Sequence, residues 1–331
     1  MTARYDVIGI GNAIVDVLAH SDDEFLAAHG LAKGAMTLID ADTAKVLYDA
    51  MAPAIECSGG SAANTIAGLA SLGAASAFIG KVRDDQLGAI FRHDIRALGV
   101  TFETLLATGG AATARCLIFV TADAQRTMQT YLGACVELGP GDIDRDLIAA
   151  AKVTYLEGYL WDPPGAKEAF ILAATVARQA GRMVALSLSD PFCVDRHRSD
   201  FCDLLNDHVD VLFANEEEIK SLYRVDTFDA AMQRVRGHCR IAALTRSKKG
   251  SVIISGDEVH VVDAVPIKPV VDTTGAGDAY AAGFLYGITH DFDLVLAARI
   301  GGIVAAEVIS HFGARAEVPL DALVRREMGS A

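Results

Sequence analysis

The sequence lacks the hallmarks of several large protein classes. None of the six cysteines forms a C-x-x-C pair, the nine histidines show no H-E-x-x-H spacing, and the 29 basic residues include no Lys/Arg-rich block. A metal held by His and Cys ligands and a nucleic-acid partner are therefore not indicated. No run of about 18 apolar residues predicts a membrane span, and no apolar leader follows Met1. We expect a cytoplasmic protein with free, mostly buried thiols.

Two common nucleotide-binding motifs are also missing. Gly9 and Gly11 begin a dinucleotide fingerprint after an apolar run, but Ile14 stands where its third glycine belongs. A Walker A loop, G-x-x-x-x-G-K-[ST], is absent as well. A nicotinamide-dependent oxidoreductase is thus a weak interpretation, and an ordinary strand-end turn explains the glycines better. The net charge of −14 further argues against membrane surfaces and nucleic acids as partners.

What is present predicts an α/β fold. Short apolar runs alternate with amphipathic stretches, the pattern of a doubly wound, mostly parallel sheet flanked by helices. The predicted core strands are Tyr5–Gly11, Ala75–Gly80, Val153–Glu157, Met183–Ser187, Val209–Ala214 and Ile241–Thr245. The predicted helices between them include Ser61–Leu72, Gln86–Leu98, Gly165–Ala180 and Phe228–Gly237. We expect one domain over residues 1–331.

Two stretches interrupt this rhythm, at roughly 13–57 and 100–135. Short β-like runs in them carry polar residues and glycines at intervals. They predict a smaller sheet inserted into the main fold, placed as a lid over a pocket. In the C-terminal third, Gly275–Ile288 and Asp291–Ser310 are rich in Ala and Gly at helical spacing, which predicts two closely packed helices.

Two segments lie where α/β folds bind ligands, one after the first core strand and one before a helix. Asn12 and Asp16 come after the first core strand, and Asp16 is suited to accept hydrogen bonds from vicinal sugar hydroxyls. Gly59 and Gly60 precede an Ala-rich helix that carries Asn64, so a ligand can approach the backbone there. For both segments an ordinary turn or cap is the competing interpretation.

The segment from Asp272 to Gly283 carries the most specific chemistry. Gly275, Ala276 and Gly277 open a predicted helix, so their N–H groups form an anion hole at the positive end of the helix dipole. Asp278 lies in the first helical turn, where a carboxylate is ready to accept a proton. The competing interpretation is that Gly-Ala-Gly only allows tight helix packing. We favour the functional interpretation, because an anion hole, a base and glycines coincide within a few residues.

These motifs together resemble the ribokinase-like, or PfkB, carbohydrate and nucleoside kinases. Gly59-Gly60 with Asn64, Asn215-Glu216-Glu217-Glu218, and Asp272-Thr273-x-Gly275-Ala276-Gly277-Asp278 occur in the order and approximate spacing of that family over nearly the whole chain. Within the family the resemblance is closest to adenosine kinases. It is supported by the segments Gly11-Asn12-Ala13-Ile14-Val15-Asp16, Gly158-Tyr159 and Asp190-Pro191-Phe192.

The resemblance implies ATP and Mg²⁺ as cofactors and a role for each matching residue. Asp278 is implied as the base, the Gly275–Gly277 amides as the anion hole, and Arg126 as a lid arginine that reaches the phosphoryl group. Asn215 and Glu218 are implied to order Mg²⁺ through water near the ATP phosphates.

The nucleotide loop departs from the family pattern. In Leu244–Gly250, Thr245 and Gly250 match, while Ser247 replaces a glycine and adds a side-chain penalty wherever φ is positive. Some family members hold a monovalent cation such as K⁺ beside the anion hole, and Asp272 and Thr274 match part of that site.

The function that the sequence favours is phosphorylation of the 5′-hydroxyl of adenosine. Asn12, Asp16, Gly59, Gly60 and Asn64 then hold the ribose. Tyr159 either lines the base pocket or packs beneath the lid. A sugar kinase for ribose or fructose, a kinase for another nucleoside, and a non-catalytic nucleotide- or sugar-sensing protein remain alternatives. A monomer and a homodimer are both compatible with the sequence.

Overall fold

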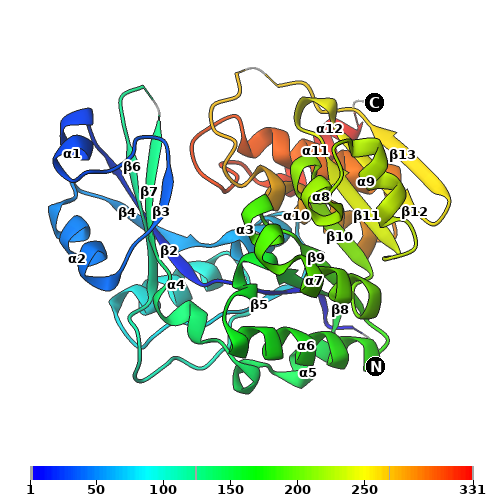
Figure 1. The fold of residues 1–331 in the computed structure, drawn as a ribbon, viewed down its shortest axis with the longest axis horizontal. Helices are drawn as coiled ribbons and strands as arrows, with labels where there is room; N and C mark the ends of the chain where they lie inside the picture. Colours follow the sequence, from blue (N-terminus) through cyan, green and yellow to red (C-terminus); the bar gives the residue numbers. More distant parts are fainter. Residues whose placement is uncertain (1–2, 124, 268, 330–331) are drawn as a thin grey trace.

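The computed structural model describes residues 3–123, 125–267 and 269–329, and a twisted eight-stranded sheet forms its centre (Figure 1). The strand order is β13-β12-β11-β10-β9-β8-β1-β5. The strands are β1 (Tyr5–Ile10), β5 (Ser76–Ile79), β8 (Ala151–Glu157), β9 (Met183–Ser187), β10 (Val211–Asn215), β11 (Ile241–Thr245), β12 (Ser251–Ser255) and β13 (Glu258–Val262). The pairs from β5 to β11 are parallel, while β12 and β13 add an antiparallel edge. The predicted doubly wound, mostly parallel sheet is confirmed.

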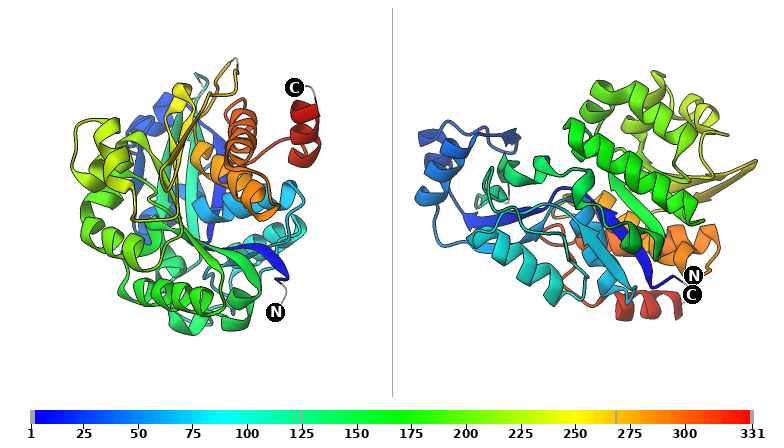
Figure 2. Two further views of the ribbon diagram at one scale, coloured as in Figure 1. Left: turned by 90° about the vertical axis from the view of Figure 1, so that its right-hand side faces the viewer. Right: turned by 90° about the horizontal axis from the view of Figure 1, so that it is seen from below.

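Helices cover both faces of this sheet (Figure 2). One core contains side chains of α5 (Arg145–Ala149), α6 (Pro164–Gln179), α7 (Pro191–Asp207), α8 (Glu216–Tyr223) and α9 (Phe228–Val235). The other contains α3 (Ser61–Ser71), α4 (Gln86–Ala97), α10 (Ala276–Thr289) and α11 (Leu294–Val308), and α12 (Leu320–Gly329) packs on α11. In β1, Val7 belongs to the second core and Ile8 and Ile10 to the first, which explains why the strand reads as a continuous apolar run. No helix in the described residues is long and apolar enough to span a bilayer.

A second, five-stranded sheet stands beside the large one (Figure 1). Its order is β3-β7-β6-β2-β4, from β2 (Ile14–His20), β3 (Met36–Leu38), β4 (Ile55–Gly59), β6 (Ala114–Val120) and β7 (Arg126–Tyr131). Leu26 of α1 (Asp23–Ala28) and Leu47 of α2 (Ala41–Ala50) share a core with Val15 and Leu117 of this sheet. The small sheet therefore has one face covered by its own helices and one face left for the cavity described below.

Helices α10 and α11 pack as closely as their Ala- and Gly-rich sequences predict. A Cβ atom added at Gly283 would lie 2.7 Å from the Gly301 Cα atom, and one at Gly287 would lie 2.5 Å from the Ala297 Cβ atom. No real Cβ contact is that short, so the two backbones meet where side chains are absent. This contact matters for the site because α10 begins at the cavity.

We expect Gly283→Val to destabilise the protein by about 3 kcal/mol, since the added methyl groups must push α11 away from α10. Denaturant unfolding followed by circular dichroism measures the loss. Val295→Leu is the control, because Val295 lies on the exposed side of α11 and is 44% exposed. Equal stabilities of the Gly283→Val variant and the wild type would show that the helices can separate without cost.

Candidate active site

A cavity of about 540 Å³ opens where the carboxyl ends of the parallel strands meet the small sheet. The position is the one expected for an α/β ligand site, because β1 has β5 on one side and β8 on the other, and chain connections diverge there. The predicted site residues that line the cavity are Asp16, Gly60, Asn64, Arg126, Tyr159, Asn215, Glu218, Thr245, Thr274, Gly275, Ala276, Gly277 and Asp278. Asn12, Gly59, Gly250 and Asp272 are not among its lining residues.

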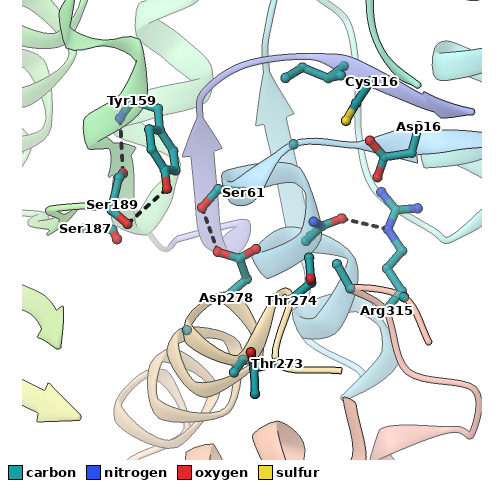
Figure 3. Close-up of a pocket in the computed structure, with 18 of the residues that line it drawn as sticks. Asp16, Ser61, Cys116, Tyr159, Ser187, Ser189, Thr273, Thr274, Asp278 and Arg315 are labelled. Atoms are coloured by element: carbon teal, nitrogen blue, oxygen red, sulfur yellow. Dashed lines mark hydrogen bonds between the residues drawn. The ribbon is translucent and has the colours of Figure 1, made fainter. Parts of the chain in front are cut away.

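Asp278 lies in the first turn of α10, inside the cavity (Figure 3). The Ser61 hydroxyl donates to its Oδ1 atom at 2.6 Å. Burial raises the pKa of Asp278 to about 6, hydrogen bonds from Ser61 and Asn64 pull this pKa down, and the Asp16 charge pushes it up. Near neutral pH the carboxylate is therefore largely ionised and basic enough to accept a proton.

Gly275 shapes the turn before α10. Its φ of 75° lies in the left-handed region, and an added Cβ atom would lie 2.7 Å from the Ala314 Cβ atom, so only glycine fits. The positive end of the α10 dipole faces the cavity at this point. The Ala276 N–H lies 3.2 Å from the Thr273 carbonyl oxygen, so this one of the three predicted anion-hole amides has an internal partner.

Asp16 projects from β2, which lies between β4 and β6 in the small sheet. It pairs directly opposite Cys57 on β4 and Cys116 on β6, so both thiols flank it in the cavity wall. Burial raises the pKa of Asp16 to about 6, against the lowering effect of Arg315 and Arg126. Burial also raises the pKa of Cys57 to about 11, so its thiol stays protonated at neutral pH.

Apolar side chains form another part of the small-sheet wall, beside the polar Ser58, Arg126 and Thr130. Ile14 and Leu18 of β2, Ile118 of β6 and Met128 of β7 line the cavity on either side of Asp16. Alternate residues of a strand share a face, which is why β2 turns Ile14, Asp16 and Leu18 toward the cavity and Val15 and Val17 toward the helices.

Asn12 takes a different place from the one predicted. It is 3% exposed, and its Nδ2 atom donates to Glu157 Oε1 at 2.6 Å instead of facing the cavity. A Cβ atom added at Gly60 would lie only 2.2 Å from the backbone carbonyl oxygen of Asn12. Gly60 also has a φ of 100°, in the region that favours glycine. In this arrangement the Asn12 side chain is bound to Glu157, and the ribose contact stays a prediction. The residue supports the Gly60 turn from below.

Arg126 begins β7 and connects the small sheet to the α10 segment. Its Nη1 atom forms an ion pair with Asp272 Oδ2 at 2.8 Å, and both side chains are at least nine-tenths buried. Its Nε and Nη2 atoms are buried without a hydrogen-bond partner among the described residues. Asp272 also accepts from the N–H groups of Thr274 and Gly313, so both of its carboxylate oxygens are hydrogen-bonded.

Asn215 and Glu218 form a capping box at the start of α8. Asn215 donates to both carboxylate oxygens of Glu218, from its N–H at 2.9 Å and its side-chain amide at 2.5 Å. Burial raises the pKa of Glu218 to about 7, and the nearby Asp190 and Asp278 carboxylates add to the rise. Among the described residues, no group of three or more His, Cys, Asp or Glu side chains is placed to hold a metal ion by itself.

The predicted nucleotide loop contains the strained turn that its serine suggests. Ser247 has a φ of 52°, in the region that favours glycine, and Gly250 has a φ of 80°. Thr245, at the end of β11, lines the cavity, while Gly250 packs against the backbone of Val262 and Asp263. Only Thr245 of the two matching residues thus reaches the cavity.

Tyr159 lies across Asp278 from Asp16 (Figure 3). Its hydroxyl donates to the Ser189 carbonyl oxygen at 3.2 Å, and its N–H donates to the Ser189 hydroxyl at 3.1 Å. Burial and the Asp190, Asp278 and Glu218 charges raise the pKa of Tyr159 well above its usual range. The phenol is therefore held toward Ser189 and stays protonated at neutral pH.

Three polar residues of the site have no assigned role in the sequence analysis. Ser61 follows the Gly59-Gly60 pair, and its place at a helix start facing the predicted base is the signal that points to it. Glu157 and Arg315 carry no such signal, because their partners lie 95 to 251 residues away in the chain.

Similar known structures include one named as a sugar kinase and one named as an adenosine kinase. A probable sugar kinase from Rhizobium etli is 50% identical with a TM-score of 0.91, and each chain covers 100% of the other. Adenosine kinase from Sinorhizobium meliloti is 53% identical with a TM-score of 0.90 over 98% of this chain and 100% of that one. Among protein sequences, adenosine kinase from Saccharomyces cerevisiae is 27% identical over 93% of this chain and 95% of its own.

A family model describes most of the same region. The model of the pfkB family carbohydrate kinases matches residues 55–321, which include β4 of the small sheet, the Asp278 segment and the Asn215–Glu218 capping box. The chain therefore belongs to the pfkB family of carbohydrate kinases, and it is an ATP-dependent phosphotransferase.

Proposed function

We propose that this protein transfers the γ-phosphoryl group of ATP to the 5′-hydroxyl of adenosine, giving AMP and ADP. One observation carries the proposal. The base candidate Asp278 lines the same cavity as Asp16, which is set among apolar side chains of the small sheet, and as Glu218 at the start of α8, the acidic end of the cavity. Asp278 interacts through its charge with both of these carboxylates. A nucleoside and a phosphate donor can therefore meet at Asp278 from opposite sides.

In the proposed reaction, the Asp278 carboxylate accepts the proton of the 5′-hydroxyl as the hydroxyl oxygen bonds to the γ-phosphorus. The bond from that phosphorus to the β–γ bridging oxygen breaks, and ADP leaves. Because such transition states are largely dissociative, placing the hydroxyl and neutralising charge matter more than early deprotonation. The amides at Gly275 and Gly277 and the α10 dipole stabilise negative charge on the transferring group.

The residues at the acidic end fit a magnesium ion held through water. Both oxygens of Glu218 already accept from Asn215, which leaves lone pairs for water but little room for direct ligation. Mg²⁺ bound with ATP neutralises phosphate charge. Asp272 and Thr274 as part of a monovalent-cation site stay a prediction, as does stacking of a base on Tyr159.

The apolar wall favours a nucleoside over a free sugar. Ile14, Leu18, Ile118 and Met128 offer no hydrogen bond to the hydroxyls that surround a free sugar. A purine face can pack on them, while Asp16 accepts hydrogen bonds from the ribose diol. Asn64 and the Gly59-Gly60 turn border the same region.

The second candidate is a kinase for ribose, fructose or a related sugar. The Rhizobium etli protein that matches over the full chain bears the name of a probable sugar kinase. Asp278 and the α10 turn serve either acceptor equally well. The choice between acceptors therefore depends on other residues of the cavity, among them Asp16 and the apolar side chains of the small sheet.

We expect wild-type protein with MgATP to form AMP from adenosine, and to leave inosine, guanosine, ribose and fructose largely unchanged. Asp278→Asn should lower the rate by about 10² to 10⁴, the usual contribution of a general base. Mass spectrometry of the products measures both. Asp229→Asn is the control, since Asp229 also lies in a first helical turn but does not line the cavity. A phosphorylated free sugar as the main product would replace the adenosine proposal with the second candidate.

The rate should fall as the pH drops through about 6, because Asp278 must be ionised to accept a proton. Ser61→Ala removes a hydrogen bond that favours the ionised form, so the acid limb of kcat/KM should move to higher pH. Steady-state kinetics between pH 5 and pH 8 measure the shift. Ser71→Ala, at the other end of α3, should leave the limb in place, and a Ser61→Ala profile that matches the wild type would contradict the assignment.

Asp278→Asn should also stabilise the folded protein above pH 6. The pKa of Asp278 rises from 3.8 to about 6 on folding, so the folded state binds the proton more tightly and loses this advantage as the pH rises through 6. At pH 8 the variant should gain at most about 3 kcal/mol over wild type, and less at pH 5. Urea unfolding at both pH values tests this. A gain that is the same at pH 5 and pH 8 would rule out the ionisation of Asp278 as its source.

A further inference from the structure

Arg315 lies on the segment between α11 and α12 and reaches into the candidate active site (Figure 3). Its Nε atom donates to Asn64 Oδ1 at 3.1 Å, and its Nη1 atom donates to Asp94 Oδ2 at 3.2 Å. The side chain is 22% exposed, although Arg is mostly a surface residue. It belongs to none of the motifs that identify the base, the anion hole or the metal ligands.

The hydrogen bond to Asn64 fixes which way the Asn64 amide points. A guanidinium group can only donate, so the atom of Asn64 that faces Arg315 must be the oxygen. The NH₂ group of the same amide then points away from Arg315, into the cavity that Asn64 and Asp278 both line. A hydrogen bond from the Asn64 side chain lowers the pKa of Asp278 and so favours the ionised carboxylate. Without Arg315, nothing in this contact prevents the planar amide from turning by 180° and presenting its oxygen to Asp278.

We propose that Arg315 is a positioning residue for phosphoryl transfer, which holds the Asn64 amide with its NH₂ group toward the Asp278 carboxylate. Asp278 then has two fixed donors, Ser61 on one side and Asn64 on the other, and its free lone pairs are aimed at the acceptor hydroxyl. The inference rests on the proposed role of Asp278 as the base.

Asp94 holds Arg315 itself in place. Its Oδ2 atom also accepts from the Ser58 N–H at 2.8 Å and from the Ser58 hydroxyl at 2.5 Å. Arg315 is thereby tied to α4 and, through Ser58, to β4 of the small sheet. Its neighbour Ala314 packs on Gly275 at the anion hole. The segment thus joins the acceptor side of the cavity to the phosphoryl side.

Other charged groups around Asp278 set the background for any pH measurement. The Asp16 carboxylate raises the pKa of Asp278 from β2. The Asp278 charge in turn raises the pKa of Glu157 and Tyr155 on β8, of Tyr159 after β8 and of Glu218 on α8. Arg315 also lowers the pKa of Asp16, so its removal changes two carboxylates in the same direction.

The kinetic test is a double-mutant cycle with Arg315→Met and Asn64→Ala, assayed with the acceptor that the wild type phosphorylates. We expect Arg315→Met to lower kcat on the order of tenfold or more and to move the acid limb of the pH profile of kcat to higher pH. If Arg315 acts through Asn64, the double variant should be no slower than Asn64→Ala alone. Losses that multiply, or an acid limb that does not move, would overturn the proposal.

Two further variants separate positioning from general stability. Arg315→Lys keeps a donor-only cation and should recover part of the lost kcat and of the pH shift. The matched control is Arg198→Met. Like Arg315, Arg198 binds a carboxylate and has a similar exposed fraction, 20%, but its second partner is a backbone carbonyl and it does not line the cavity. This control should match the wild type in kcat and pH profile. A pH shift in Arg198→Met would assign the effect to stability and reject the proposal.

A measurement without substrate distinguishes this proposal from the choice of acceptor. The side-chain NH₂ signals of Asn64, identified in ¹⁵N NMR spectra by their loss in Asn64→Ala, should titrate with pH in the wild type and not in Asp278→Asn. In Arg315→Met this titration should be lost or strongly reduced. An unchanged titration in Arg315→Met would overturn the inference, whichever acceptor the enzyme phosphorylates.

Discussion

The whole site depends on one buried carboxylate, that of Glu157 at the end of β8. It accepts from the Asn12 N–H at 3.3 Å, from the Asn12 side-chain amide at 2.6 Å and from the Ala62 N–H at 2.8 Å. Burial raises the pKa of Glu157 to about 7, and these three donors offset much of the cost of removing the charge from water. The carboxylate thereby fixes the end of β1 and the first turn of α3 together.

The Glu157 contacts with Asn12 and Ala62 position the groups that surround Asp278, the proposed base. Because Glu157 holds Ala62 at the start of α3, Ser61 precedes it directly and Asn64 follows on the same turn, where both can donate to Asp278. Asp278 lies on α10, 217 residues after Ser61 in the chain. The packing of α10 against α3 and α11 therefore sets its position. A buried carboxylate with a raised pKa lowers the stability of the folded protein near neutral pH, because the folded state disfavours its charged form. The raised pKa of Asp278 therefore reduces stability and also makes Asp278 a stronger base.

Local patterns predicted most of the architecture. The core strands and helices appear within a few residues of their predicted bounds because strands buried on both faces are written as continuous apolar runs. The strand β4 was not predicted, since Glu56, Cys57 and Ser58 interrupt its apolar pattern, and the antiparallel β12 and β13 were not separated from the turns around them.

The site was predictable only where a motif is contiguous. Asp278 and its anion hole lie on one turn of helix, and the Asn215–Glu218 capping box spans four residues. Asn12 lies beside the predicted region but faces Glu157, because a polar residue after a strand can face the core as well as the ligand. Glu157 and Arg315 act through partners 95 to 251 residues away, and such pairings follow from topology, not from spacing.

The proposed catalytic groups and most of the groups that can distinguish one acceptor from another lie on different sheets, which explains why Asp278 does not determine the acceptor. Asp278, Glu218 and the α10 turn belong to the large sheet and its helices, and their chemistry is the same for any alcohol. The groups that can distinguish one acceptor from another, Asp16 and the apolar side chains beside it, belong to the small sheet. Arg126 connects these two parts through Asp272, and Arg315 does so through Asp94 and Ser58. In the proposed reaction, new side chains on one face of the five-stranded sheet can therefore change the acceptor, while Asp278 and its donors stay as they are.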